Sequence, residues 1–265
     1  MGTGQHRRNS PSIVRTSRRR SVVAVSVFVL LLLTVSACGT ATSKTTSQPL
    51  TSEQAATLAD ALYLNYQDKG ALFTANAAWT SLGRTISMSG EVDWTTTTGH
   101  ALVRSTGADA GLAEIWWNQD TIIEYWPMLA NIAPSFGYSD AKFVSRPLDA
   151  ERRLVDRVIS VVNSLAAAER ENALLIQQKP GSEFVRNDEL QNQPVEVLRY
   201  GMRNMYWIGV ESNRMIRFDG NAESGTAPVV VDLVMAGAQT ITPPPLRNVI
   251  ASDKIQSLYS SLTGP

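Results

Sequence analysis

Few side chains in this sequence could carry out catalysis. The chain has two histidines, His6 and His100, and one cysteine, Cys38. A zinc site built from histidine and cysteine needs three or four such ligands close together, so these residues do not make one. A Ser-His-Asp triad would depend on His100, and no Gly-x-Ser-x-Gly turn accompanies it. We therefore expect His100 to be a surface histidine beside a turn.

Paired carboxylates are the next catalytic candidate. Glu114 and Glu124 stand symmetrically about the expected turn 118–120, where they could act as the acid and base of a glycosidase. Two glutamates that both face solvent explain this spacing more simply. The glycines at 107 and 111 lack the lysine of a phosphate-binding loop. The sequence thus predicts no enzyme, no metal site and no cofactor, with catalysis by Glu114 or His100 as the third-ranked alternative.

The clearest chemistry lies at Cys38, where a thiol ends an apolar run. A basic stretch, Arg15–Arg20, precedes the apolar segment Val22–Leu33. That segment has the length of a signal-peptide core and is short for a membrane span. Small residues, Ser36 and Ala37, come directly before the cysteine and would give a peptidase access to the backbone.

The sequence Val35-Ser36-Ala37-Cys38 resembles the lipobox of bacterial lipoproteins. The resemblance implies that residues 1–37 are a cleaved signal peptide and that the Cys38 thiol carries diacylglycerol. Membrane lipid would then hold the protein at the extracytoplasmic face of the cell membrane, and two acyl chains anchor far more firmly than one. An ordinary signal peptide with a chance cysteine, or a short signal anchor, is the alternative.

Residues 38–51 are rich in Ser and Thr and are expected to form a flexible tether. A random coil of this length spans about 20 Å, so the domain would stay close to the bilayer. Residues 1–37 hold six of the 24 basic residues and no acid, which leaves 18 basic and 24 acidic groups. Such an acidic chain does not suit a nucleic-acid partner.

Residues 52–265 are expected to form a single domain of class α+β. Thr51 and Gln54 fit a capping box, which predicts a helix over Ser52–Gln67, with a second helical piece up to Trp79 as an option. Asp149 is the predicted N-cap of a helix that ends near Ala168. Alternating apolar residues predict strands over 85–94, 100–105, 112–117, 121–126, 183–188, 194–200, 205–210, 214–218 and 228–235.

Other segments fill in this plan. Residues 127–147 are predicted to be a loop with one helical turn, and 252–262 a short closing helix. No strand alternates with a crossover helix, so a parallel sheet is not expected. The pattern indicates one large antiparallel sheet with helices against one face.

A further resemblance follows from this order of elements. The turn Asp188–Pro194 before the strand Val195–Leu198, and the strand pair Met205–Val210 and Asn213–Phe218, are similar to LolA-type half-barrels, above all to the actinobacterial LppX/LprG-type lipoproteins. The resemblance covers about residues 52–242. It implies a curved antiparallel sheet with helices packed on its concave face over an apolar cavity for acyl chains. It brings no catalytic residues with it.

Adjacent Trp116 and Trp117 must point to opposite faces of the sheet. One of them would pack in the core and the other beneath the loop that follows, or both would line an apolar groove. The predicted lining of a ligand cavity consists of Ile86, Met88, Val92, Ile115, Trp117, Ile123, Val158, Val162 and Leu165. Packing of an ordinary core explains each of these positions equally well.

Two functions from different classes follow. The first is a membrane-anchored lipoprotein that binds or carries an acylated lipid, or another hydrophobic ligand, in an apolar cavity. The alternative is an envelope lipoprotein with a filled interior that docks a protein partner through the same sheet. Neither function requires a cofactor.

Overall fold

The computed structural model describes residues 47–79, 83–107, 110–220, 228–256 and 259. The fold reported below belongs to the described residues from 47 onward. The predicted signal peptide, Cys38 and the tether up to residue 46 lie outside the described residues. Among the helices that are described, none combines the length and apolar character needed to cross a membrane.

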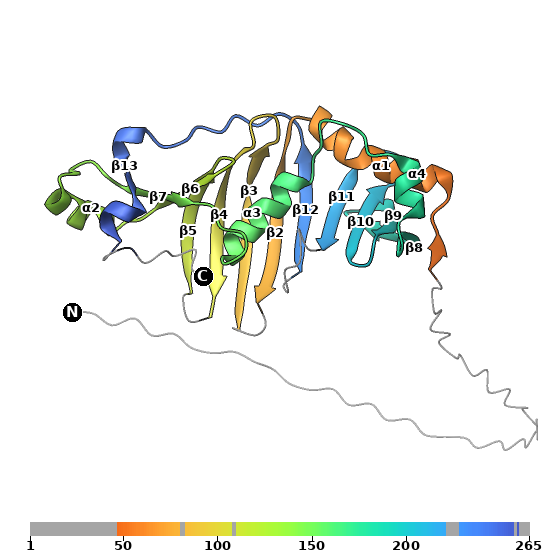
Figure 1. Ribbon diagram of the computed structural model, residues 1–265, viewed down its shortest axis with the longest axis horizontal. Coiled ribbons are helices and arrows are strands. Elements are labelled where there is room, and N and C mark those ends of the chain that lie inside the picture. The colour runs from red at the N-terminus through yellow and green to blue at the C-terminus, as the bar shows by residue number, and fades with distance from the viewer. Residues whose placement is uncertain (1–46, 80–82, 108–109, 221–227, 257–258, 260–265) are drawn as a thin grey trace, which may run out of the picture. The chain divides into compact units, whose positions relative to one another are not determined.

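One open sheet of thirteen strands dominates the described residues. Its spatial order is β1-β8-β9-β10-β11-β12-β2-β3-β4-β5-β6-β7-β13, and it is visible across Figure 1. Every pairing is antiparallel except that of β13 with β7. The strands are β1 (Gln48–Pro49), β2 (Gly70–Trp79), β3 (Arg84–Asp93), β4 (Thr98–Thr106), β5 (Gly111–Trp117), β6 (Thr121–Tyr125), β7 (Phe143–Pro147), β8 (Glu183–Leu190), β9 (Gln193–Tyr200), β10 (Asn204–Gly209), β11 (Met215–Gly220), β12 (Val229–Ala236) and β13 (Val249–Ala251).

The longer helices lie against the sheet. Helix α3 contacts β2, β3 and β12, and helix α1 contacts β2, β10 and β11, so they cover neighbouring parts of it (Figure 1). The predicted class, α+β with helices against one face of a large antiparallel sheet, is confirmed. The helices are α1 (Ser52–Gln67), α2 (Leu129–Ile132), α3 (Leu154–Ser164) and α4 (Ala173–Gln178), with 3-10 turns η2 (Ala133–Phe136), η3 (Leu246–Asn248) and η4 (Ser252–Ile255).

Helix α1 has the predicted bounds because its capping box forms. The Gln54 backbone N–H donates to Thr51 Oγ1 at 3.1 Å, and Thr51 N–H donates to Gln54 Oε1 at 3.1 Å. These two bonds satisfy groups that a helix start leaves without intrahelical partners. The helix therefore begins at Ser52, and the buried Leu50 just before it already belongs to the fold. The predicted tether thus overlaps the domain at its end, where Gln48 and Pro49 pair with β8.

Two helical predictions are wrong. Residues 70–79 form strand β2, because Ala71, Phe73, Ala75 and Ala77 alternate into the core, which is the period of a strand. Helix α3 begins at Leu154 and not after Asp149. The N–H groups of Arg152 and Arg153 both bond to the Asp149 carbonyl oxygen, and this turn occupies the segment where the helix was expected.

The remaining differences concern short elements. Strand β7 lies within the predicted loop 127–147, and the loop's helical turn is α2. The loop predicted over 189–193 is shorter, because Gln191 and Asn192 alone, both at positive φ, connect β8 to β9. Within the predicted closing helix, residues 252–255 form the 3-10 turn η4.

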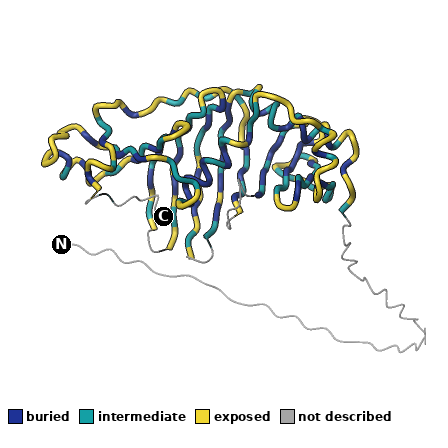
Figure 2. The backbone as a smooth tube through the Cα atoms, in the orientation of Figure 1, coloured by how far each residue is buried: buried dark blue, intermediate teal, exposed yellow. Residues whose placement is uncertain are grey.

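The main core lies between the sheet and the helices. Alternate residues of β2 to β5 meet the apolar stripe of α3, whose Leu154, Val158, Val161 and Val162 are all buried. Figure 2 shows the buried positions running along the central strands. Small side chains on β2 leave room for the helix backbone to approach the sheet closely.

Candidate functional site

Eight of the nine predicted lining residues meet in the main core. None of the eight is more than 5 % exposed. A side chain bordering a wide internal space would be accessible to water-sized molecules, so these eight pack closely beneath the helices. Ile86 also borders an open surface groove. They are Ile86, Met88, Val92, Ile115, Trp117, Val158, Val162 and Leu165.

The ninth residue, Ile123, does not share this face. In the pairing of β5 with β6, Trp117 stands opposite Ile122 and Trp116 stands opposite Ile123. Trp117 and Ile122 are buried in the main core, so Ile123 and Trp116 lie on the other side of the sheet. The assignment of Ile123 to the helix-covered face is therefore wrong. The adjacent Ile122 occupies that face instead.

Hydrogen bonds hold the C-terminal end of α3 against the sheet and α1. The indole N–H of Trp94 donates to the Val162 carbonyl oxygen at 3.0 Å. Trp117 Nε1 donates to Asn163 Oδ1 at 3.1 Å, and Asn65 Nδ2 donates to the Leu165 carbonyl oxygen at 2.7 Å. Opening a space beneath this end of the helix would break all three bonds.

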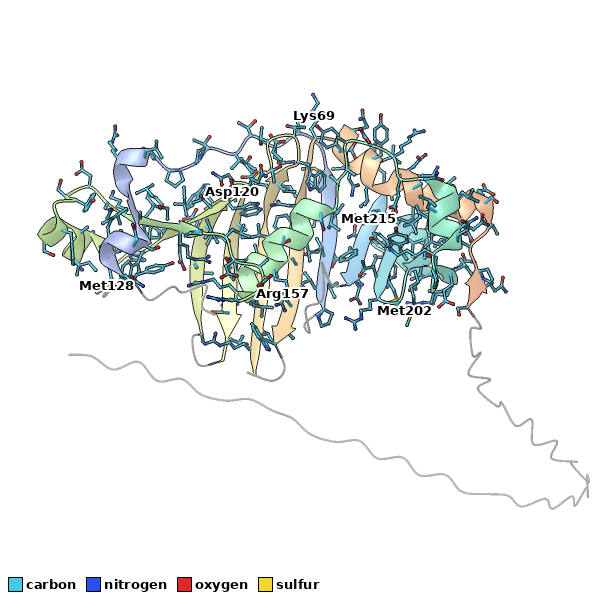
Figure 3. The ribbon with its side chains drawn as sticks, in the orientation of Figure 1. Lys69, Asp120, Met128, Arg157, Met202 and Met215 are labelled. Atoms are coloured by element: carbon cyan, nitrogen blue, oxygen red, sulfur yellow. The ribbon has the colours of Figure 1, made fainter. Side chains whose placement is uncertain are left out.

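A buried ion pair holds the N-terminal end of α3. Arg146 on β7 binds Asp156 through two parallel N–H···O bonds of 2.6 and 2.7 Å, and both side chains are buried. Burial alone would lower the pKa of Arg146, but the bonds to Asp156 and its charge outweigh burial and raise that pKa. Arg157, labelled in Figure 3, adds contacts to the carbonyl oxygens of Ala150 and Glu151. Polar contacts thus hold both ends of helix α3 against the rest of the fold.

The opposite side of the sheet, which we call the outer face, carries exposed apolar side chains. Leu102 is 49 % exposed and Leu112 58 % exposed. Strand pairing places them in one area with neighbouring aromatic residues of β5, β6 and β7. We define the aromatic patch as Leu102, Leu112, Trp116, Ile123, Tyr125 and Phe143.

Ring contacts connect the centre of the aromatic patch. The Trp116 ring meets Phe143 edge to face with centroids 5.5 Å apart, and Tyr125 lies 5.5 Å from the same Phe143 ring. The His100 ring stacks on the other side of Trp116 at 4.7 Å. Aromatic side chains that present one face to a sheet and another to solvent provide contact area for a ligand at little cost in conformational entropy.

Charged groups border the aromatic patch. His100 Nε2 lies 3.0 Å from Glu114 Oε1, and His100 Nδ1 lies 3.4 Å from Glu91 Oε1. Arg104 stands opposite Leu112 in the strand pairing. His100 was predicted to be a surface histidine beside a turn; it lies next to the turn before β4, but its side chain is only 28 % exposed and stacks on Trp116.

The catalytic carboxylate pair does not form, and the expectation that both glutamates face solvent is wrong for Glu124. Glu114 lies on the outer face, whereas Glu124 is buried on the helix-covered side and accepts a hydrogen bond from the Tyr259 hydroxyl at 2.7 Å. The two carboxylates are therefore separated by the sheet. Across the part of the chain that the structure describes, no group of three or more His, Cys, Asp or Glu side chains is placed to hold a metal ion.

An open groove of about 410 Å³ lies on the outer face near the ends of β2, β3 and β12. Its floor is made by small side chains, among them Ala78, Thr85 and Ser87, and Pro228 forms one wall. Sequence reasoning missed this face. A usable signal was present in β4, where Leu102 falls between His100 and Arg104 on the polar side of the alternation.

No protein-family model and no curated protein matches the chain. Among solved structures, similarity is found to the Mycobacterium tuberculosis lipoprotein LppX at 9 % identity and a TM-score of 0.40, over 72 % of this chain and 95 % of that one. An uncharacterised conserved protein from Thermus thermophilus matches at 9 % identity and a TM-score of 0.35, over 72 % and 94 %. The Pseudomonas aeruginosa MucA/MucB complex matches at 8 % identity and a TM-score of 0.31, over 71 % and 57 %.

Proposed function

We propose that this protein is a non-enzymatic binding protein of the cell envelope, anchored through acylated Cys38, that docks a protein partner on the outer face of its sheet. The observation that carries the docking proposal is the aromatic patch, in which the exposed Leu102 and Leu112 lie on the same face as the packed rings of Trp116, Phe143 and Tyr125. The anchor rests on the lipobox-like sequence before Cys38.

The composition of the outer face favours a protein over a lipid as its ligand. Acyl chains do not offer partners to charged groups, and burying Glu91, His100 and Glu114 against them would cost free energy. A protein interface combines an apolar centre with a hydrogen-bonding rim, which is the arrangement seen here. Glu91 and Glu114 both flank His100, so we infer that the partner presents a Lys or Arg beside its apolar side chains.

A carrier of acylated lipid is the second candidate. It is favoured by the continuous apolar interface between α3 and the sheet, which could receive alkyl chains if the helix moved away. Such movement would break the buried ion pair of Arg146 with Asp156 and the hydrogen bonds at the other end of α3. One acyl lipid per protein, found by native mass spectrometry of the purified protein, would favour this carrier.

The docking proposal is tested by a photoreactive phenylalanine analogue placed at Leu102 or Leu112 in cells. We expect both positions to cross-link to the same protein, which is identified and purified. Leu102→Asp should then weaken binding of that protein at least tenfold, about 1.4 kcal/mol, because a charge enters the apolar centre of the interface.

Leu174 on α4 supplies the matched control, since it is exposed and apolar but lies far from the patch in the sequence and on another element. The analogue at Leu174 should give no adduct with the same protein, and Leu174→Asp should leave binding unchanged. Adducts with lipid at Leu102, or equal effects of the two Asp variants, would contradict docking on the outer face.

The anchor is tested separately by Cys38→Ser. We expect wild-type protein to sediment with membranes and its N-terminal peptide to carry acyl groups in mass spectrometry. The variant cannot form the thioether to diacylglycerol. It should therefore neither sediment with membranes nor carry acyl groups, because it has no acyl chains to bury in the bilayer. An unmodified Cys38 in membrane-bound wild-type protein would refute the anchor and leave the docking proposal standing.

A further inference from the structure

A second cavity lies on the other side of the sheet, away from the aromatic patch. It has a volume of about 440 Å³ and lies between β7, the turn before α3 and the turn η4. Most of its lining side chains are polar or charged. They are Arg146, Pro147, Asp149, Arg153, Ser252, Asp253, Gln256 and Tyr259.

Most charges around this cavity are balanced by neighbours. Arg146 is engaged by Asp156. The Asp149 carboxylate lies 3.9 Å from Arg152 Nε and accepts the Arg152 backbone N–H at 3.2 Å. Asp253 lies 3.9 Å from Lys254 Nζ. The carboxylates of Asp149 and Asp253 are therefore each paired with an exposed basic side chain, Arg152 and Lys254.

Arg153 differs from these residues. Its Nη1 atom is buried and has no hydrogen-bond partner among the described residues. A buried guanidinium N–H without an acceptor costs free energy, and folded proteins normally supply an acceptor for each such group. Arg153 also lines the cavity, which is polar and large enough to hold such an acceptor beside the guanidinium.

We propose that this cavity binds a small molecule through an oxyanion, a phosphate or a carboxylate, that accepts a hydrogen bond from Arg153. Arginine presents a planar fork of N–H donors that matches either anion. Ser252 and Gln256 add neutral donors to the wall. The Tyr259 hydroxyl is already bonded to Glu124, so its ring serves as a wall for the rest of the molecule. The cavity volume exceeds that of a bare phosphate, which leaves space for such a remainder.

The test uses the purified protein, with sodium phosphate and sodium acetate as probes and sodium chloride at equal ionic strength as the reference. At a probe concentration ten times its Kd, selective binding to the folded state should raise Tm by about 3–5 °C. At equal concentrations of the two probes, a larger rise in Tm with phosphate than with acetate would identify the oxyanion as phosphate, and the reverse order as carboxylate.

Arg153→Gln should abolish the rise, and Arg153→Lys should keep part of it. Arg203 is the matched control, because it is exposed and does not line the cavity. Arg203→Gln should behave as wild type. If Arg153→Gln does not fold, amide chemical shifts of the wild-type protein decide: phosphate or acetate should move those of Arg153, Ser252 and Gln256 together. No rise with either probe, or equal losses at Arg203 and Arg153, would overturn the proposal.

Discussion

Replacing Asp156 by alanine is expected to lower the free energy of unfolding by about 3–5 kcal/mol, or Tm by roughly 10 °C. The carboxylate is buried and accepts two bonds from Arg146 and one from the backbone N–H of Asp149, the last at 2.7 Å. Without it, the buried Arg146 guanidinium loses the two bonds that hold its charge, and Glu124 remains as a nearby acid. Urea unfolding followed by circular dichroism measures the loss.

Two further variants show whether the effect belongs to the unpaired charge. Asp253→Ala removes an exposed carboxylate from a loose pair with Lys254 and should change stability by less than about 0.5 kcal/mol. Replacing both partners of the buried pair, Arg146→Met with Asp156→Leu, should restore part of the stability. The Arg146 charge is then no longer buried without its carboxylate partner, although the buried Glu124 loses a nearby cation. A double variant as unstable as Asp156→Ala would contradict this account.

The sequence predicted correctly those helix starts and turns that are determined by hydrogen bonds between residues close together in the chain. The capping box of Thr51 and Gln54 fixed the start of α1, and Asn118 caps its own hairpin by accepting the N–H groups of Asp120 and Thr121. Where signals competed, the prediction went wrong. Residues 70–79 contain alanines that favour a helix, and only pairing with β3 and β12 on both sides makes them a strand.

Side chains far apart in the sequence decide the rest of the site. Arg146 and Asp156 form an ion pair only because β7 and α3 meet, and no spacing rule within one element predicts that contact. The cavity beside Arg153 likewise combines the start of α3 with η4, about a hundred residues later in the chain. The aromatic patch needs three strand pairings, each of which had to be in the correct register before its members could be seen as neighbours.

The last large effect concerns two isoleucines that the sequence alone could not tell apart. Ile115→Ala should lower the free energy of unfolding by about 2–5 kcal/mol, because Ile115 is fully buried in the packed core between sheet and helices. Ile123→Ala, the same change on the outer face, should cost less than about 1 kcal/mol. Chemical unfolding of both variants measures the difference.

The comparison also tests whether the interior beside Ile115 is packed in the free protein. If Ile115 bordered a space for acyl chains, its truncation would enlarge that space and remove few contacts, so both variants would be similarly stable. A packed core predicts a large loss for Ile115→Ala with binding by the remaining folded protein intact. Ile123→Ala should show the opposite pattern, near-normal stability with weaker docking of the partner, because Ile123 stands beside Trp116 in the aromatic patch. Equal stabilities would restore the lipid carrier and argue against the outer face.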